Sequence, residues 1–228
     1  MKKVKIGVLV SGSGSNLQSI IDQIERGLLQ AEIKVVISNC PDAYALARAA
    51  KHHLAVQVIS QLDFREREDF DRQLTGALQT CDVELVVLAG FMRVLTPFFL
   101  RSFPGRVMNI HPALLPVFPG LHVQQQALDY GVKFAGCTVH FVDESVDTGP
   151  IIIQAVVPVF DDDTADTLAA RILREEHRIY PRAIQLYAEG RLEVRGRKVV
   201  VAGGGRSELN ALHNPSLGMF ATEHGNPI

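Results

Sequence analysis

The sequence predicts an α/β protein whose sheet is doubly wound and mostly parallel, with an antiparallel pair of strands toward its C-terminal part. Over the first half of the chain, apolar runs of strand length alternate with amphipathic runs of helix length. The strand-like runs are apolar at nearly every position, which is typical of parallel strands covered by helices on both faces. Two later runs, 134–142 and 151–160, are joined by too few residues for a crossover helix, so we expect them to pair antiparallel.

The expected elements follow one another along the chain. Strands are expected at 4–10, 32–38, 55–60, 83–90, 106–110, 134–142 and 151–160. Helices are expected at about 15–29, 44–53 and 65–80, where apolar residues recur at three- and four-residue spacing. A long amphipathic helix should run from about Thr164 to Glu189 and be interrupted or ended near Pro181, because proline removes a backbone donor.

The composition indicates one sizeable domain, expected at residues 1–202, and a glycine-rich polar tail at 203–228. The formal net charge of -2 does not favour a nucleic-acid-binding surface, and no apolar run approaches the ~20 residues that span a bilayer. Cys40, Cys81 and Cys137 are widely spaced and form no CxxC motif. We therefore expect free thiols and a cytoplasmic protein.

A glycine-rich turn separates the first expected strand from its helix. Gly14, Ser15 and Asn16 lead into the helix, whose free N–H groups suit an anion, most naturally a phosphate. A tight turn with a serine cap uses the same residue types, so that alternative stays open. A dinucleotide fingerprint requires a glycine where Leu17 stands, and the chain contains no GK[ST] motif. The turn therefore favours a single phosphate over NAD or ATP.

Polar side chains gather where the strand at 106–110 gives way to a loop. Asn109 and His111 are two residues apart, so strand alternation directs both to one side. An amide and an imidazolium can together stabilise an oxyanion, and Asp147 can fold against His111 and favour its charged form. Taken singly, His111 is an ordinary loop residue, Asp147 an ordinary turn residue and His140 an ordinary core or edge histidine. The histidine spacing indicates no metal site, and the GxSxG motif of serine hydrolases is absent from the sequence.

Five segments together resemble a known family, the folate-dependent phosphoribosylglycinamide formyltransferases of purine synthesis. They are "SGSGSNLQSII", "VVLAGFMRVLTPFF", "NIHPALLPVFPGLHVQQQAL", "GCTVHFVDESVDTGPIIIQAVVPV" and "EEHRIYP". The resemblance covers roughly residues 4–190, and the Asn-x-His-Pro and His-x6-Asp elements are highly specific for folate formyl-transfer domains. It implies a Rossmann-like fold, 10-formyltetrahydrofolate as cosubstrate, and no metal.

The resemblance also implies roles for individual residues. The catalytic trio is expected at Asn109, His111 and Asp147, where direct attack by the substrate amine gives a tetrahedral intermediate stabilised by the first two. The phosphate and the rest of the ribonucleotide are expected at Gly14, Ser15, Asn16 and Glu176. The folate is expected at Arg67, Met92, Arg93, Val94, Leu95, Val142, Asp143 and Glu144, with His140 and His122 as supporting residues.

Two positions depart from the family pattern. Val117 stands where relatives commonly carry a basic residue, and Leu173 replaces a polar one, which affects substrate affinity and not the reaction.

Three alternatives stay open beside this assignment. A methionyl-tRNA formyltransferase is expected to carry a second, basic domain, and a formyltetrahydrofolate hydrolase a regulatory domain before this one. A non-catalytic nucleotide-binding module of the same fold is the third. We expect small-molecule substrates and no nucleic-acid or membrane partner, while the sequence leaves the oligomeric state, a homodimer included, open.

Overall fold

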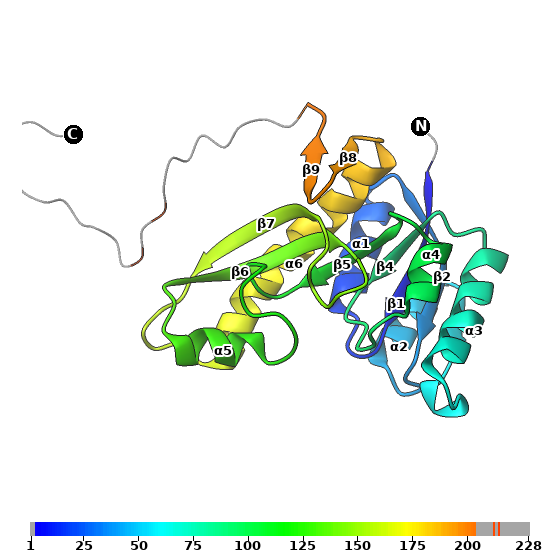
Figure 1. Cartoon of the computed structure of the whole chain (residues 1–228), viewed down its shortest axis with the longest axis horizontal. Helices are drawn as coiled ribbons and strands as arrows, with labels where there is room; N and C mark the ends of the chain where they lie inside the picture. Colours follow the sequence, from blue (N-terminus) through cyan, green and yellow to red (C-terminus); the bar gives the residue numbers. More distant parts are fainter. Residues whose placement is uncertain (1–2, 204–211, 213, 215–228) are drawn as a thin grey trace, which may run out of the picture.

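Nine strands form one sheet in the computed structural model, which describes residues 3–203, 212 and 214 (Figure 1). The strands are β1 (Val4–Val10), β2 (Ala31–Ser38), β3 (Val56–Val58), β4 (Leu85–Leu88), β5 (Val107–His111), β6 (Phe134–Phe141), β7 (Ile151–Pro158), β8 (Leu192–Arg195) and β9 (Lys198–Val201). The α-helices are α1 (Ser15–Glu25), α2 (Tyr44–Lys51), α3 (Arg67–Thr80), α4 (Pro97–Ser102), α5 (Val123–Tyr130) and α6 (Ala165–Ala188). The sheet order is β3-β2-β1-β4-β5-β6-β7-β9-β8.

The sheet changes from parallel to antiparallel pairing at β6. The strands from β3 to β5 pair in parallel, whereas β6 pairs antiparallel with both β5 and β7. The predicted α/β class and the antiparallel pairing of the two later strands are therefore confirmed. The β5–β6 register sets Asn109 opposite His140 and His111 opposite Thr138, so β6 brings a second histidine to the end of β5.

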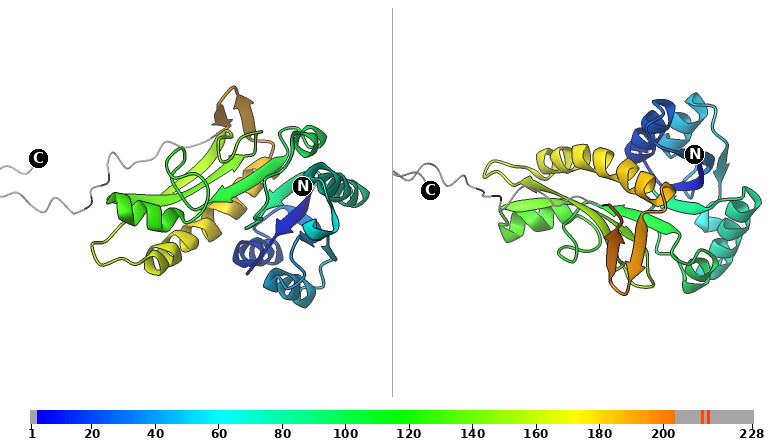
Figure 2. Two further views of the ribbon diagram at one scale, coloured as in Figure 1. Left: turned by 60° about the horizontal axis from the view of Figure 1, so that its bottom comes forward. Right: turned by 90° about the horizontal axis from the view of Figure 1, so that it is seen from above.

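Helices cover both faces of the sheet, as a doubly wound fold requires. On one face α1, α2 and α6 bury Leu17, Ala45 and Tyr180 against the strands, and on the other α3 and α4 bury Leu74 and Phe99. The two groups of helices lie on opposite sides of the strands in Figure 2. Since β1, β4 and β5 are adjacent and parallel, the loops that follow them emerge at the same edge of the sheet.

The long C-terminal helix is not interrupted at Pro181, so that prediction is wrong. α6 continues from Ala165 to Ala188 with the proline inside it. A proline removes one helical hydrogen bond, but the neighbouring Tyr180 and Ile184 are fully buried. Burial of this apolar helix face outweighs the lost bond.

Several short elements differ from the expected ones. The strand expected at 55–60 is reduced to β3, and α4, α5 and the β8–β9 hairpin are absent from the prediction. Elements of four to eight residues are too short for hydrophobic periodicity to reveal them. β9 joins the sheet by pairing in parallel with β7, where Ile151 lies opposite Lys198.

The expected tail at 203–228 lies outside the described residues except for 203, 212 and 214. The side-chain amide of Asn214 donates to the carbonyl oxygens of Lys133 and Val159, at 2.6 and 2.7 Å. This described position of the tail therefore contacts the end of the β6–β7 pair.

Candidate active site

The turn after β1 presents backbone N–H groups at the edge where the strands end. Gly14 precedes α1 with a φ of 71°, and a Cβ at this position would lie 2.6 Å from the Cβ of Ala45. The carbonyl oxygens of Gly12 and Ser13 accept hydrogen bonds from the Ala45 N–H at 3.0 Å and from Nε of Arg48 at 2.8 Å. The turn's carbonyls are thus engaged by α2, and the first N–H groups of α1 are left for an anion.

Asn16 and Glu176 connect this turn with α6. Nδ2 of Asn16 donates to Oε2 of Glu176 at 2.7 Å, and both residues are buried. Burial raises the pKa of Glu176, while the hydrogen bond from Asn16 and a positive charge on His111 oppose this rise. Oδ1 of Asn16 is buried without a partner among the described residues, which makes it a candidate contact for a ligand donor.

His140 orients the amide of Asn109. Across the β5–β6 pair, Nδ2 of Asn109 lies 3.3 Å from Nε2 of His140. Nδ1 of His140 lies 2.8 Å from the carbonyl oxygen of Phe141, which can only accept, so Nδ1 carries the proton and Nε2 accepts from Asn109. Burial lowers the pKa of His140 and so favours this neutral form. The amide of Asn109 is therefore held with one N–H on His140, while the other has no partner among the described residues and can serve a ligand.

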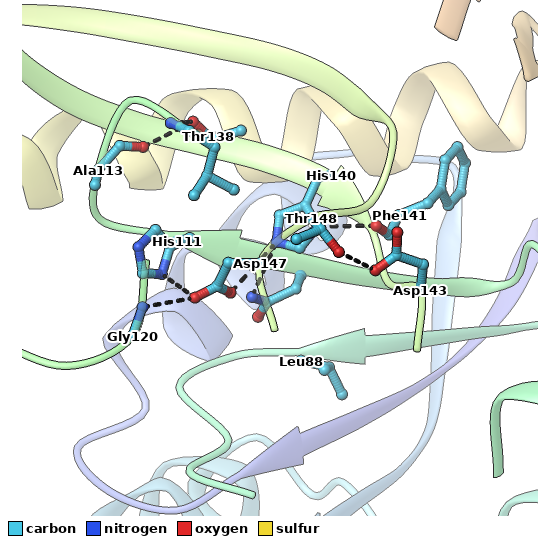
Figure 3. Close-up of polar contacts among 12 residues, drawn as sticks. Leu88, His111, Ala113, Gly120, Thr138, His140, Phe141, Asp143, Asp147 and Thr148 are labelled. Atoms are coloured by element: carbon cyan, nitrogen blue, oxygen red, sulfur yellow. Dashed lines mark hydrogen bonds and ion pairs between the residues drawn. The ribbon is translucent and has the colours of Figure 1, made fainter. Parts of the chain in front are cut away.

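Both ring nitrogens of His111 face hydrogen-bond acceptors. Nε2 lies 2.9 Å from the carbonyl oxygen of Phe118. Nδ1 lies 3.3 Å from Oδ2 of Asp147, a contact drawn in Figure 3. Asp147 also accepts from the N–H of Gly120 at 2.9 Å, and its Oδ1 lies 3.8 Å from Nε2 of His140. Two acceptors satisfy the two N–H groups of an imidazolium, so these surroundings suit a positive charge on His111. The structure thus brings the predicted trio into one group with His140.

Asp143 shapes the loop that carries Asp147. Its Oδ1 accepts a hydrogen bond from the hydroxyl of Thr148 at 2.6 Å, which closes the loop (Figure 3). Asp147 itself has a φ of 56°, a left-handed conformation that aspartate tolerates better than bulky residues do. Of the other predicted folate residues here, Val142 is half-buried and Glu144 is exposed.

The predicted folate residues after β4 lie at the same edge. Met92 and Val94 expose 65% and 53% of their surface, whereas Leu95 is buried. Nη2 of Arg67, on α3, donates to the carbonyl oxygen of Val94 at 2.7 Å, so this arginine contacts the other predicted folate residues directly. Arg93 is half-buried between them.

His122 lies outside this group of contacts. It is exposed and directly precedes α5, and its side chain makes no hydrogen bond with the part of the chain that the structure describes. Conversely, sequence reasoning missed the carbonyl of Phe118, the N–H of Gly120 and the guanidinium of Arg48. The first two are backbone groups, for which the Pro119–Gly120 turn is the nearest sequence signal.

Within residues 3–203, 212 and 214, no helix combines the length and apolar character needed to cross a membrane. The same residues contain no group of three or more His, Cys, Asp or Glu side chains placed to hold a metal ion.

The glycine turn before α1 and an amide–imidazole–carboxylate group share one edge of the sheet, which is the usual place of the active site in an α/β enzyme. The comparison with protein families is specific about the class. The model of the formyl transferase family matches residues 4–184, and the chain belongs to this family.

The chain is also similar to individual named proteins. The chain is 44% identical to the phosphoribosylglycinamide formyltransferase of Escherichia coli (strain K12), over 84% of this chain and 90% of that protein. It is 49% identical to the trifunctional purine biosynthetic protein adenosine-3 of Drosophila melanogaster, over 83% of this chain but only 14% of that protein's length. The crystal structure of glycinamide ribonucleotide transformylase 1 from Symbiobacterium toebii matches with a TM-score of 0.86 and 52% identity, covering 87% of this chain and 94% of that one.

A formyltetrahydrofolate deformylase from Pseudomonas syringae pv. tomato has a similar fold. Its TM-score is 0.82 at 27% identity, over 88% of this chain and 66% of that chain. The fold is therefore common to transfer and hydrolysis of the formyl group, while the sequence identity is higher to the formyltransferases.

Proposed function

We propose that this chain is a phosphoribosylglycinamide formyltransferase, which moves the formyl group of 10-formyltetrahydrofolate to the primary amine of 5′-phosphoribosylglycinamide. The observation that carries the proposal is the common edge of the sheet, where Asn16 of the glycine turn binds Glu176 and the His111–Asp147 pair lies close enough for the charge of His111 to act on that carboxylate. A substrate with a phosphate at one end and an amine at the other suits this arrangement. Membership of the family and the similarity to formyltransferases support the same reaction.

The phosphate of the ribonucleotide binds the N–H groups at the start of α1, helped by the nearby charge of Arg48. The free Oδ1 of Asn16 and the carboxylate of Glu176 accept hydrogen bonds from the rest of the ribonucleotide. The pterin of the folate lies against the exposed apolar side chains of Met92 and Val94. This places the formyl group near the end of β5.

In the reaction, the amine nitrogen forms a bond to the formyl carbon, and the carbonyl electron pair moves onto the formyl oxygen. The second N–H of the Asn109 amide and the protonated His111 stabilise this oxyanion, His111 by turning its Nε2–H from the Phe118 carbonyl to the oxyanion. Asp147 holds the imidazolium and orders a water that carries the proton of the attacking amine to N10. The electron pair of the oxyanion then re-forms the carbonyl, and the bond between the carbon and the protonated N10 breaks, which releases tetrahydrofolate and leaves the formyl group on the substrate amine.

One incubation separates this function from its alternatives. The protein is mixed with 10-formyltetrahydrofolate, and tetrahydrofolate formation is followed with and without the ribonucleotide. Formation that depends on the ribonucleotide supports the transferase. Formation without it indicates a hydrolase, and no formation in either mixture indicates a non-catalytic module.

Substitutions test the assigned roles. Asn109→Ala and His111→Ala should each lower kcat about 10²–10³-fold, the usual cost of removing one oxyanion donor. His53→Asn is the matched control, because His53 is an exposed histidine beyond α2 whose left-handed backbone asparagine tolerates. If either site variant kept the turnover of the control at saturating substrate, the proposed roles would be wrong.

The phosphate turn offers its own matched pair. A Cβ at Gly14 collides with Ala45, whereas a Cβ at Gly12 meets nothing within 4 Å. Gly14→Ala should therefore raise the KM for the ribonucleotide at least about tenfold and leave the KM for the folate nearly unchanged, while Gly12→Ala changes neither much. Equal effects of Gly14→Ala on both constants would contradict a phosphate site at this turn.

Two further predictions accompany the function. We expect a cytoplasmic enzyme, a prediction that rests on the three unpaired cysteines. A homodimer also stays a prediction, which light scattering of the purified protein can test.

A further inference from the structure

The segment Met92–Leu95, called the 92–95 segment below, is held in an unusual way. It belongs to the loop between β4 and α4, at the edge of the sheet where the folate is proposed to bind. Two of its apolar side chains, Met92 and Val94, are more than half exposed, so their burial cannot fix the segment. Only Leu95 is buried in the core beneath it. The shape of the segment therefore depends on hydrogen bonds to its backbone.

Two residues of α3 supply these hydrogen bonds at the end of the segment. Oδ2 of Asp71 accepts from the N–H of Thr96 at 2.6 Å, and Nη2 of Arg67 donates to the carbonyl of Val94 at 2.7 Å. Asp71 and Arg67 are four residues apart, and therefore lie one above the other on the same helix face. They bind backbone groups two residues apart in the chain, which fixes both the position and the direction of the segment.

The beginning of the segment is held from another direction. The hydroxyl of Ser11, at the end of β1, accepts from the N–H of Met92 at 2.8 Å and donates to Oδ1 of Asn39 at 2.6 Å. Ser11 is not on α3, so a change in Asp71 leaves this first contact intact. Loss of Asp71 should then release only the end of the segment and not detach it from the sheet.

The carboxylate of Asp71 is costly to keep where it is. Asp71 is 2% exposed, and its burial raises its pKa, against the hydrogen bond from Thr96 and the positive charges of Arg67 and Arg93. Arg93 belongs to the 92–95 segment, and Thr96 directly follows it. The carboxylate of Asp71 therefore attracts the segment through the charge of Arg93 and through the N–H of Thr96. A residue with only a packing role in this helix would be served by an apolar side chain of the same size.

We propose that Asp71 is a positioning residue for the folate cosubstrate, whose buried carboxylate holds the Thr96 backbone and thereby keeps the 92–95 segment in the shape that receives the pterin. This rests on the proposed function, since it assigns the segment to folate. Asp71 touches no substrate. Its effect reaches the folate through Thr96, whereas the turn at Gly14 is held by α2 and makes no hydrogen bond with Asp71 among the described residues.

The test compares Asp71→Ala with Asp71→Asn. Asp71→Ala removes the acceptor and should raise the KM for 10-formyltetrahydrofolate about 10–100-fold, the change that corresponds to one lost hydrogen bond to a charged group. The KM for the ribonucleotide should stay within about twofold, because its turn is not attached to α3. Asp71→Asn keeps an oxygen that can accept from Thr96, and should restore most of the folate affinity.

A matched control separates positioning from a general loss of stability. Asp163 is another carboxylate in a hydrogen-bonded setting, with its side chain 3% exposed and bound by Arg171 at 2.6 Å, but it lies before α6 and away from the 92–95 segment. Asp163→Ala should lower the unfolding midpoint without raising the KM for the folate. The proposal is overturned if Asp163→Ala shifts this KM as much as Asp71→Ala does, or if Asp71→Ala raises both KM values equally.

A second variant covers the case in which Asp71→Ala does not fold. Thr96 has φ -78° and ψ 160°, which proline also adopts, and it already precedes Pro97. Thr96→Pro therefore removes the donor of the same hydrogen bond while keeping the carboxylate, and should give the same selective rise in the KM for the folate. An unchanged folate KM in Thr96→Pro refutes the proposal.

Direct binding of tetrahydrofolate to the full chain distinguishes failure of the proposal from failure of the proposed function. If the wild-type chain binds tetrahydrofolate and Asp71→Ala binds it about 10–100-fold more weakly, both stand. If the two proteins bind it equally well, the positioning role fails and the formyltransferase assignment survives. If the wild-type chain binds no tetrahydrofolate, both fail together.

Discussion

Replacing Glu176 with glutamine removes a buried charge without removing its hydrogen bond. Glu176 is 7% exposed, and its Oε2 accepts from Nδ2 of Asn16 at 2.7 Å. The amide oxygen of Glu176→Gln can accept the same bond, so only the desolvated charge is lost. The raised pKa shows that burial of this charge costs more than the attraction of His111 and the Asn16 hydrogen bond return, and the variant should therefore be more stable than the wild type at neutral pH. Its affinity for the ribonucleotide should fall, because the same carboxylate is proposed to hold that substrate.

The size of the gain should depend on pH in a defined direction. Burial raises the pKa of Glu176 above its ordinary 4.5, against the hydrogen bond from Asn16 and the charge of His111, which lower it. A carboxyl group with a raised folded-state pKa makes the folded state less stable as the pH rises through that pKa, by about 1.4 kcal/mol for each unit of elevation. Below about pH 4 the group is neutral in both states, so wild type and variant should be equally stable. At about pH 7.5 the variant should gain about 1 kcal/mol or more, or about 2–4 °C in Tm for each kcal/mol.

Urea unfolding at a series of pH values measures this difference. The chain contains no tryptophan, so far-ultraviolet circular dichroism of the helices is the suitable signal. Glu175→Gln is the matched control, because the Glu175 side chain is 27% exposed and pairs with Arg178 at 2.9 Å. The control should show no gain that grows with pH, and the KM for the ribonucleotide should rise at least about tenfold in Glu176→Gln alone. A Glu176→Gln variant that is less stable than wild type at pH ~7.5, or a stability difference independent of pH, refutes the reasoning.

Three further outcomes are expected. Tyr180→Phe removes a buried hydroxyl that lies 2.9 Å from a carbonyl oxygen of β4 and from one of β5, and should cost about 1–3 kcal/mol in urea unfolding, so an unchanged midpoint would contradict the prediction. Arg171 holds the pKa of Asp163 below its usual range, so Asp163→Asn should be less stable than wild type at neutral pH, and calorimetry should find this deficit shrinking as the pH falls below about 4. Burial raises the pKa of Cys137 to about 12, and iodoacetamide should therefore modify this thiol only after unfolding, as mass spectrometry of the native and unfolded protein can establish.

The sequence was informative where side chains follow a regular backbone pattern. Asn109 and His111 were predicted to share a side of their strand from alternation alone, and in the structure both belong to the group around His140 and Asp147. The glycine turn was predictable because position 14 has a left-handed backbone and no room for a Cβ against Ala45 of α2, and only glycine suits both conditions. In both cases one local rule is enough to place the residue.

The rest depends on contacts that no local rule describes. The prediction that the last helix breaks at Pro181 applied a correct rule on proline, but the burial of Tyr180 next to it overrides that rule. One of the two acceptors of His111 is the backbone carbonyl of Phe118. This residue has a left-handed φ of 53°, which is rare for a bulky residue and has no signature in the sequence. Asp71 is one acidic residue among several on α3, and only its burial beneath Thr96 distinguishes it.

The reversal of strand direction at β6 explains why the candidate catalytic group forms where it does. The parallel half of the sheet brings the ends of β1, β4 and β5 to one edge, where the two ligands are proposed to bind. A further parallel strand beside β5 would bring only its own last residues to that edge. Because β6 instead runs antiparallel past the end of β5, it sets His140 beside Asn109 within the sheet, and the short loop after it returns Asp147 to His111. Residues of β5, of β6 and of the loop after β6 thus surround one point, and the antiparallel pair adds to this edge the groups that are proposed to move a proton.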